Sequence, residues 1–390
     1  MGHVETDPAI ASEQPSLQKF LSLCAETNIA AFPAAADWGI NLLISGDFQE
    51  RWRLAKVLRK VGDPICLPLL AIAEDKTQDV ELRWFAVRIL GQYRSAEVIV
   101  RLIVLLEDCR EEFLADEIMR ALVRLEEKAT DYIVPLLQQP EMRLLAVKAL
   151  CKVRYPNIVE PLLSVVQDED PEVRSLALEA LGGFRHELIF GCLLAGLQDP
   201  ASSVRTEAVR ALGFWANIAD KNKIFAQVAP LLHDHNLEVC RQAGLTLSRL
   251  QTIEAVEAIA QVLQSETTPF SLKAELIQAL SWIEHDASLE ALGTILTTAS
   301  EPLILEIIKV FGRINEANHR QAQATKILLR FWQQKSSSLR PNIRQDLAYS
   351  LGQLKQVIAQ PLLTKLSEDC DSGVKLHAIA ALNKLPTVNS

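Results

Sequence analysis

Cysteine and histidine are the residues of this chain that could bind a metal ion or an iron–sulfur cluster. The 390-residue sequence contains seven of each. The segment HDHNLEVC brings His233, His235 and Cys240 close together, but this spacing matches no standard zinc pattern. Cys109 and Cys370 stand in the acidic segments EDCREE and EDCDSG, where their thiols could bridge a cluster to a partner protein. The sequence therefore favours no cofactor of the protein's own, with an iron–sulfur cluster shared with a partner as the alternative.

The other cysteines favour reduced thiols in a cytoplasm. The total is odd, no CxxC pair occurs, and Cys66, Cys151 and Cys192 fall on predicted apolar helix faces. The N-terminus is acidic and polar rather than a signal sequence, and no apolar run reaches the roughly eighteen residues that span a bilayer. We therefore expect a cytoplasmic protein without a membrane span.

Basic residues recur at one position and could form a row of phosphate ligands. The alternative is a ladder, in which each basic residue pairs with an acidic loop of a neighbouring repeat. A net charge of −9 and the flanking acidic residues disfavour nucleic acid as the partner and favour the ladder. We expect Asp168, Asp170, Asp199 and Asp234 to be the acidic partners. The basic positions are Arg83, Arg143, Arg174, Arg205, Lys273, Arg344 and Lys375, with Ala115, Cys240 and Ile304 as exceptions.

Motifs of enzymes are absent from the sequence. It contains no GxxxxGK[ST], GxGxxG, GxSxG or HExxH. His186 and His285 each stand five residues after a repeated leucine, a position typical of a turn, and they are too far apart in the array to act together. The sequence therefore favours a non-catalytic role and predicts no catalytic residue.

A repeat of about thirty residues must position all of these side chains. VRSLALEALG, at 173–182, shows the pattern of the first helix of each repeat: an aliphatic residue, a basic residue, and a leucine eight residues after the first. A second amphipathic segment such as NIVEPLLSVV follows, and an acidic loop often precedes the next repeat. We call the repeated residue the anchor. The anchors are Leu58, Leu90, Leu122, Leu150, Leu181, Leu212, Leu247, Leu280, Phe311, Leu351 and Leu382.

This pattern predicts an all-α protein, an α-solenoid of about ten to eleven helical hairpins stacked in a superhelix, because one hairpin cannot bury its apolar face alone. We expect a disordered tail at 1–14, two capping helices within 15–46 and the array at 47–390. An interval of 28 residues between Leu122 and Leu150 predicts a shortened hairpin. An interval of 40 before Leu351 predicts a mobile loop at 333–341.

The repeats resemble a known family. VRSLALEALGGF, VRTEAVRALGFW and LRWFAVRILGQY, followed by PLL-type helices and Asp-Pro loops, are similar to HEAT repeats, in particular the short subclass of cyanobacterial phycobilin lyases. The resemblance covers roughly residues 47 to 390. It implies either a scaffold that partners the iron–sulfur assembly factor IscA, or a phycobilin lyase, isomerase or chaperone that acts on a phycobiliprotein with a phycobilin as its cofactor.

A stacked array offers a concave surface, which we expect the second helices to line and a protein partner to bind. Trp84 and Trp282 are predicted to be core residues, with a role as interface hot spots as the alternative. Tyrosines beside arginines are better candidates for exposure, because a large ring with a polar edge suits an interface. The candidate partner-binding residues are Tyr93, Arg94, Arg154, Tyr155, Trp215, Cys109, Cys240 and Cys370.

Overall fold

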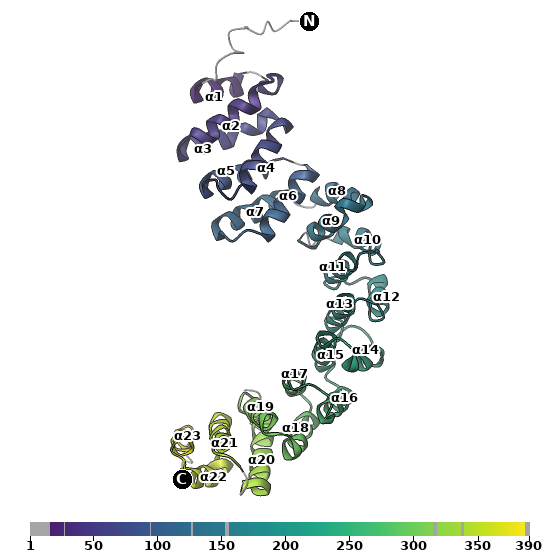
Figure 1. Ribbon diagram of the computed structural model, residues 1–390, viewed down its shortest axis with the longest axis vertical. Coiled ribbons are helices and arrows are strands. Elements are labelled where there is room, and N and C mark those ends of the chain that lie inside the picture. The colour runs from purple at the N-terminus through teal and green to yellow at the C-terminus, as the bar shows by residue number, and fades with distance from the viewer. Residues whose placement is uncertain are drawn as a thin grey trace. The chain divides into compact units, whose positions relative to one another are not determined.

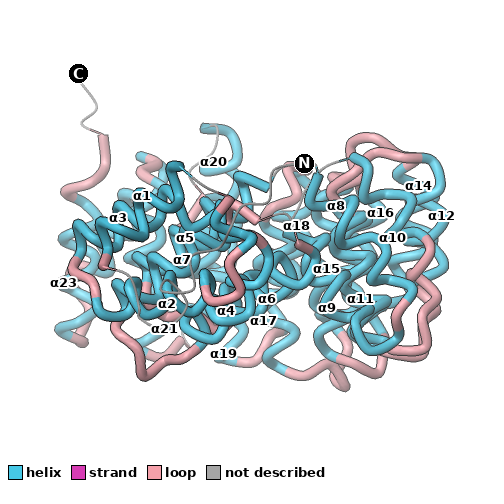
Figure 2. The backbone as a smooth tube through the Cα atoms, turned by 90° about the horizontal axis from the view of Figure 1, so that it is seen from above, coloured by secondary structure: helices cyan, strands magenta, loops and turns pink. Residues whose placement is uncertain are grey.

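The computed structural model describes residues 16–26, 28–93, 95–125, 128–152, 156–314, 318–336 and 339–386. These residues form helices and connecting turns, and no strand occurs among them (Figure 2). The prediction of an all-α protein is therefore confirmed. The expected tail at 1–14 lies outside the described residues. The chain divides into two compact units, Met1–Phe184 and Arg185–Ser390.

The first unit contains two leading helices and the repeats that follow them. Short 3-10 turns at Leu58–Val61, Val134–Gln138 and Pro156–Ile158 complete several of the hairpins. The helices are α1 Leu17–Glu26, α2 Ala35–Ser45, α3 Phe48–Val57, α4 Cys66–Glu74, α5 Val80–Leu90, α6 Ala96–Glu107, α7 Glu112–Leu125, α8 Lys128–Ile133, α9 Pro140–Lys152, α10 Val159–Leu163 and α11 Pro171–Leu181.

The second unit continues the same alternation of first and second helices. Its last described helix, α23, is a first helix with Leu376 and Ile379 exposed. The helices are α12 Glu187–Gly196, α13 Ser202–Gly213, α14 Lys221–Val228, α15 Leu237–Leu250, α16 Ile253–Gln264, α17 Phe270–Ser281, α18 Asp286–Thr298, α19 Glu301–Gly312, α20 Asn318–Lys335, α21 Pro341–Leu354, α22 Gln360–Leu366 and α23 Ser372–Leu382.

Like helices pack on like helices, which makes two layers in each unit. First helices contact first helices, as α5 contacts α7 and α19 contacts α21, and second helices contact second helices, as α4 contacts α6 and α16 contacts α18. In the second unit the first helices lie on the inner side of the curve and the second helices on its outer side (Figure 1). The expectation that second helices line the concave surface was therefore wrong for this unit.

Helix α11 shows why the sequence folds in this way. The carboxylate of Asp170 accepts a hydrogen bond from the amide of Glu172, and Pro171 occupies the first turn, where its missing N–H costs nothing. Val173, Ala177 and Leu181 recur every four residues and are buried. The cap therefore sets where the helix begins, and the spacing sets which face it buries.

The 28-residue interval is confirmed as a shortened hairpin, because α8 spans only Lys128–Ile133 before a 3-10 turn. The loop predicted at 333–341 was wrong over its first residues. The extra length of that repeat extends α20 to Lys335, and α21 begins at Pro341. An insertion of about one helical turn can lengthen a helix without disturbing the stack, since both hairpin ends keep their places.

Candidate interaction surfaces

The predicted ladder is present at several of its arginine positions, and two of the arginines, Arg205 and Arg344, each hold two loops together. Arg205 donates to both carboxylate oxygens of Asp234, at 2.8 and 2.7 Å, and to the backbone carbonyl of Asp199 at 2.8 Å. Arg344 does the same with Asp369, at 2.8 Å for both contacts, and with the carbonyl of Leu339. A side chain bonded to two loops at once has no donor pair left for a phosphate. The ladder is therefore structural.

Two details of the ladder differ from the prediction. Asp170 caps α11 rather than pairing with a basic residue through its carboxylate. The first repeat also has a ladder residue, which the alignment of the repeats within this sequence did not find. Arg51 donates to the carbonyl of Leu43 at 3.0 Å and to Glu81 at 2.9 Å. Arg51 stands seven residues before Leu58, as the other ladder residues stand before their anchors. Counting back from the anchor would have found it.

The rung at Asp369 makes stability depend on pH. Hydrogen bonds from Arg344 are the main cause that lowers the pKa of this carboxyl to about 2, from an ordinary value near 4. Because the folded-state pKa is the lower one, the stabilisation is fully present above pH ~4 and is lost as the pH falls towards 2. We expect Asp369→Asn to lower the denaturant midpoint at neutral pH, and the difference from wild type to shrink below pH ~4. A difference that stays constant across this range in urea titrations would contradict the assignment.

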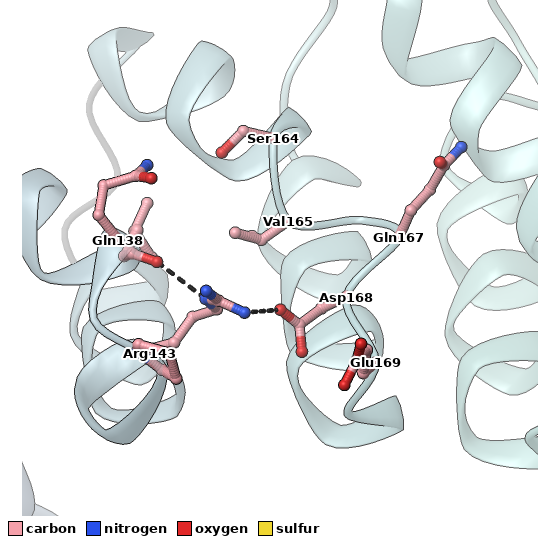
Figure 3. Close-up of a pocket in the computed structure, with 9 residues that line it drawn as sticks. Gln138, Arg143, Ser164, Val165, Gln167, Asp168 and Glu169 are labelled. Atoms are coloured by element: carbon pink, nitrogen blue, oxygen red, sulfur yellow. Dashed lines mark hydrogen bonds and ion pairs between the residues drawn. The ribbon is translucent and has the colours of Figure 1, made fainter.

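An open cavity of about 570 Å³ lies beside another rung in the first unit (Figure 3). Its walls are the turn at Leu137–Pro140 and the loop from Ser164 to Glu169. Arg143 reaches between them, donating to the carbonyl of Leu137 at 2.8 Å and pairing with Asp168. Arg143 and Asp168, two of the charged residues that line this cavity, already pair with each other and so satisfy one another rather than a ligand.

Within the described residues, the cysteines and histidines do not assemble into a metal site. No group of three metal-ligating side chains occurs in the described parts of the chain. Cys240 occupies a ladder position, is buried, and its thiol contacts the carbonyl of Asp234 at 3.1 Å. Burial raises its pKa. The side chain of Cys240 is 2% exposed, so it does not lie at the surface, where a partner-binding residue would be expected.

The loop cysteines predicted to face a partner are isolated from one another. Cys370 is exposed, 3.5 Å from the carboxylate of Asp369. Cys109 is partly buried, and its thiol contacts the carbonyl of Glu111 at 3.5 Å. Burial raises the pKa of Cys109. Each thiol stands alone, so any cluster would need the partner to supply the remaining ligands.

The histidines five residues after the anchors are turn residues, as predicted. The imidazole Nδ1 atoms of His186 and His285 accept hydrogen bonds from the amides of Leu188 and Ala287 at the starts of α12 and α18. Each therefore replaces the Ser or Asp that commonly caps a helix.

Two of the aromatic side chains predicted to bind a partner, Tyr93 and Trp215, are buried rather than exposed. Tyr93 is 5% exposed, and its hydroxyl donates to the carbonyl of Leu58 at 2.9 Å, so the prediction of an exposed ring was wrong. Trp215 is also buried, at 7%. Neither ring can contact a partner in this structure. Arg94, Arg154 and Tyr155 lie outside the described residues.

The first unit carries four nearly parallel rings across α3, α5 and α7. Phe48 stacks on Trp52, Trp52 on Trp84, and Trp84 on Phe113, with centroids 5.5 to 6.4 Å apart. The guanidinium of Arg88 lies 4.6 Å from the centre of Trp52 and 5.1 Å from that of Trp84. Trp84 is buried, as predicted. This stack already contains its own cation, and it ties three helices together.

A row of exposed aromatic and arginine side chains lies where the first helices of the second unit end. The alignment of the repeats within the sequence did not predict this row. We call it the turn-edge row. Its four residues each stand two places after an anchor, in consecutive repeats, and all are exposed. The prediction that Trp282 belongs to the core was wrong, because its side chain is 54% exposed. The row consists of Phe214, Arg249, Trp282 and Arg313.

Contacts from neighbouring repeats hold the residues of the turn-edge row in place. The guanidinium of Arg249 lies 5.0 Å from the centre of the Phe214 ring. Arg185 donates to the carbonyl of Phe214 at 3.1 Å, and Gln251 donates to that of Trp282 at 3.0 Å. Trp and Arg are the residues enriched at the energetic centres of protein interfaces. Because its backbone is tied to neighbouring repeats, the row presents these side chains in a fixed order.

Known proteins share the repeats found here. The family model of HEAT repeats matches residues 130–188 and 192–281, so HEAT repeats are present in these segments. No curated protein matches the sequence. In the described residues, no helix is both long and apolar enough to cross a membrane.

Solved structures also match, at low identity. An engineered protein is 18% identical over 94% of this chain and 98% of its own, with a TM-score of 0.40. Kap121p, in a complex with Pho4p, is 12% identical over 94% of this chain and has a TM-score of 0.49. Importin beta is 13% identical over 94% of this chain, with a TM-score of 0.45. The chain spans about half the length of these last two proteins, 51% and 57%.

Proposed function

We propose that this protein is a cytoplasmic, non-catalytic scaffold that holds a protein partner on its second unit. The observation that supports this function best is the turn-edge row, where a 54% exposed tryptophan and a 47% exposed phenylalanine alternate with arginines. An exposed tryptophan costs free energy in water, and a folded chain recovers that cost when a partner covers the ring. HEAT repeats supply the rigid support for such a surface.

The partner we propose is IscA, so that the scaffold would serve iron–sulfur cluster assembly in a cyanobacterium. The support is the resemblance of the repeats to the cyanobacterial subclass, together with exposed Cys370 beside the acidic loop. A phycobilin lyase, isomerase or phycobiliprotein chaperone is the competing function suggested by the same resemblance. A lyase would need a side chain to act on the tetrapyrrole, and no residue is assigned that role.

The test is co-purification with matched variants. The tagged protein is co-expressed with IscA and, separately, with a phycobilin and an apo-phycobiliprotein. We expect wild type to retain IscA and Trp282→Ala to lose it, while Phe270→Ala, which removes a 50% exposed ring from the opposite end of α17, retains it. Retention of IscA by both variants would reject the turn-edge row as its site. Chromophore attachment above the control without this protein would reject the non-catalytic role.

A further inference from the structure

From the turn-edge row we infer the chemistry of the segment that it binds. The ligand is an extended peptide of the partner protein. In this peptide one large apolar residue is flanked by two acidic residues, one three positions before it and one three positions after it. This inference rests on the proposed scaffold function and gives that function a sequence to recognise. Its central contact is the apolar residue against Trp282, and its outer contacts are the carboxylates against Arg249 and Arg313.

The charges of the row call for acidic side chains in the partner. Most arginines of the second unit pair with a carboxylate of the same chain, for example Arg205 with Asp234 and Arg330 with Glu290. Arg249 and Arg313 are exposed, and no carboxylate of the described residues lies within ion-pair distance of either. The guanidinium of Arg249 lies over the face of the Phe214 ring. Both guanidinium groups therefore remain free to bind carboxylates, for which their geometry is suited.

The exposed rings call for an apolar side chain between those carboxylates. Trp282 and Phe214 are half-exposed, although each stands where the chain turns from a first helix to a second helix. The amide of Glu284 donates to the side-chain carbonyl of Gln251 at 2.6 Å, and the side-chain amide of Gln251 donates to the carbonyl of Trp282. These two hydrogen bonds attach the turn that contains Trp282 to the preceding repeat. Little ordering is then needed when a ligand covers the ring.

The repeat sets the spacing within the peptide. Packed helices lie about 8–10 Å apart, so successive members of the row are separated by about that distance. An extended peptide advances about 3.3 Å per residue, so about three residues span one repeat. Arg249, Trp282 and Arg313 belong to three consecutive repeats. Their ligands therefore stand at positions i, i+3 and i+6 of the peptide.

Single-stranded nucleic acid could also contact arginines and aromatic rings, and the same row has to be tested for it. Glu284, two residues after Trp282, and Glu254, five residues after Arg249, are exposed, and the chain carries a net charge of −9; these negative charges repel phosphates. A peptide brings two localised negative charges rather than a continuous line of them. The observations therefore favour the peptide.

The experiment measures binding of a fluorescein-labelled peptide, GGEGSLGSEGG, to the full chain by fluorescence anisotropy. We expect Trp282→Ala, Arg249→Gln and Arg313→Gln each to weaken binding by about ten-fold or more. Phe270→Ala serves as the control and leaves binding unchanged. A peptide with the carboxylates moved to two residues on either side of the leucine, GGGEGLGEGGG, is expected to bind about ten-fold more weakly.

Each outcome bears on a separate claim. Equal binding of the two peptides, or equal binding to wild type and Trp282→Ala, would overturn the inferred motif. A labelled single-stranded oligonucleotide that binds in an Arg249-dependent way, while the acidic peptide does not, would overturn it in favour of nucleic acid. If the peptide fails but co-purified IscA still depends on Trp282, the motif is wrong and the scaffold function stands. Loss of both would reject the scaffold function at this surface as well.

Discussion

Phe311→Ala is expected to destabilise the second unit by about 3–5 kcal/mol. Phe311 is fully buried in α19, at the anchor position, where the neighbouring repeats carry Leu280 and Leu351. Removing the ring leaves a cavity between α19 and the first helices on either side, with which it packs. Close-packed interiors fill such cavities poorly, so both the transfer free energy and the cavity contribute.

Phe311→Leu is the matched control, since leucine is the usual anchor in this chain and repacks most of the space. We expect it to cost about 1 kcal/mol. Urea unfolding gives the global change, and hydrogen exchange of the α19 amides shows whether the loss is local, as nearest-neighbour coupling in repeat arrays requires. Similar losses for the two variants would show that Phe311 is not packed as described.

Gly352→Ala is expected to be the most damaging of the small substitutions, at about 1–3 kcal/mol. A Cβ at this position would lie 2.6 Å from the Cβ of Ala381 and 2.8 Å from its Cα, so α21 and α23 would have to move apart. These two helices pack on each other extensively. The glycine is therefore needed for close approach of two backbones.

Gly191→Ala makes the same chemical change in α12 with the opposite expected sign. No atom of another element lies within 4 Å of a Cβ there, so alanine should stabilise the helix by about 0.5–1 kcal/mol. Thermal unfolding of the two variants beside wild type measures both shifts. A pair of variants that shift the melting temperature in the same direction would refute the assigned contact between α21 and α23.

The exposure of several aromatic side chains could have been predicted from their positions relative to the anchor of each repeat. The position three residues after the anchor is buried at Tyr93, Trp215 and Ile283, whereas the position two residues after it is exposed at Phe214 and Trp282. These positions are counted from anchors that the sequence already supplies. Tyr93 was predicted to be exposed because Arg94 follows it in the sequence, whereas its place in the repeat predicts burial.

The sequence by itself determined the helices, the repeat and the ladder. These follow from spacings within one hairpin, where an apolar residue every three or four positions fixes the buried face and a loop acid caps the next helix. The tertiary structure alone decided which arginines remain unpaired and how the two layers curve in the second unit. Arg205 stands seven residues before its anchor and Arg249 two residues after its own, and only the structure shows that Arg205 meets a carboxylate about thirty residues away while Arg249 lies over a phenylalanine ring. Such contacts depend on how one repeat stacks on the next, which local spacing does not encode.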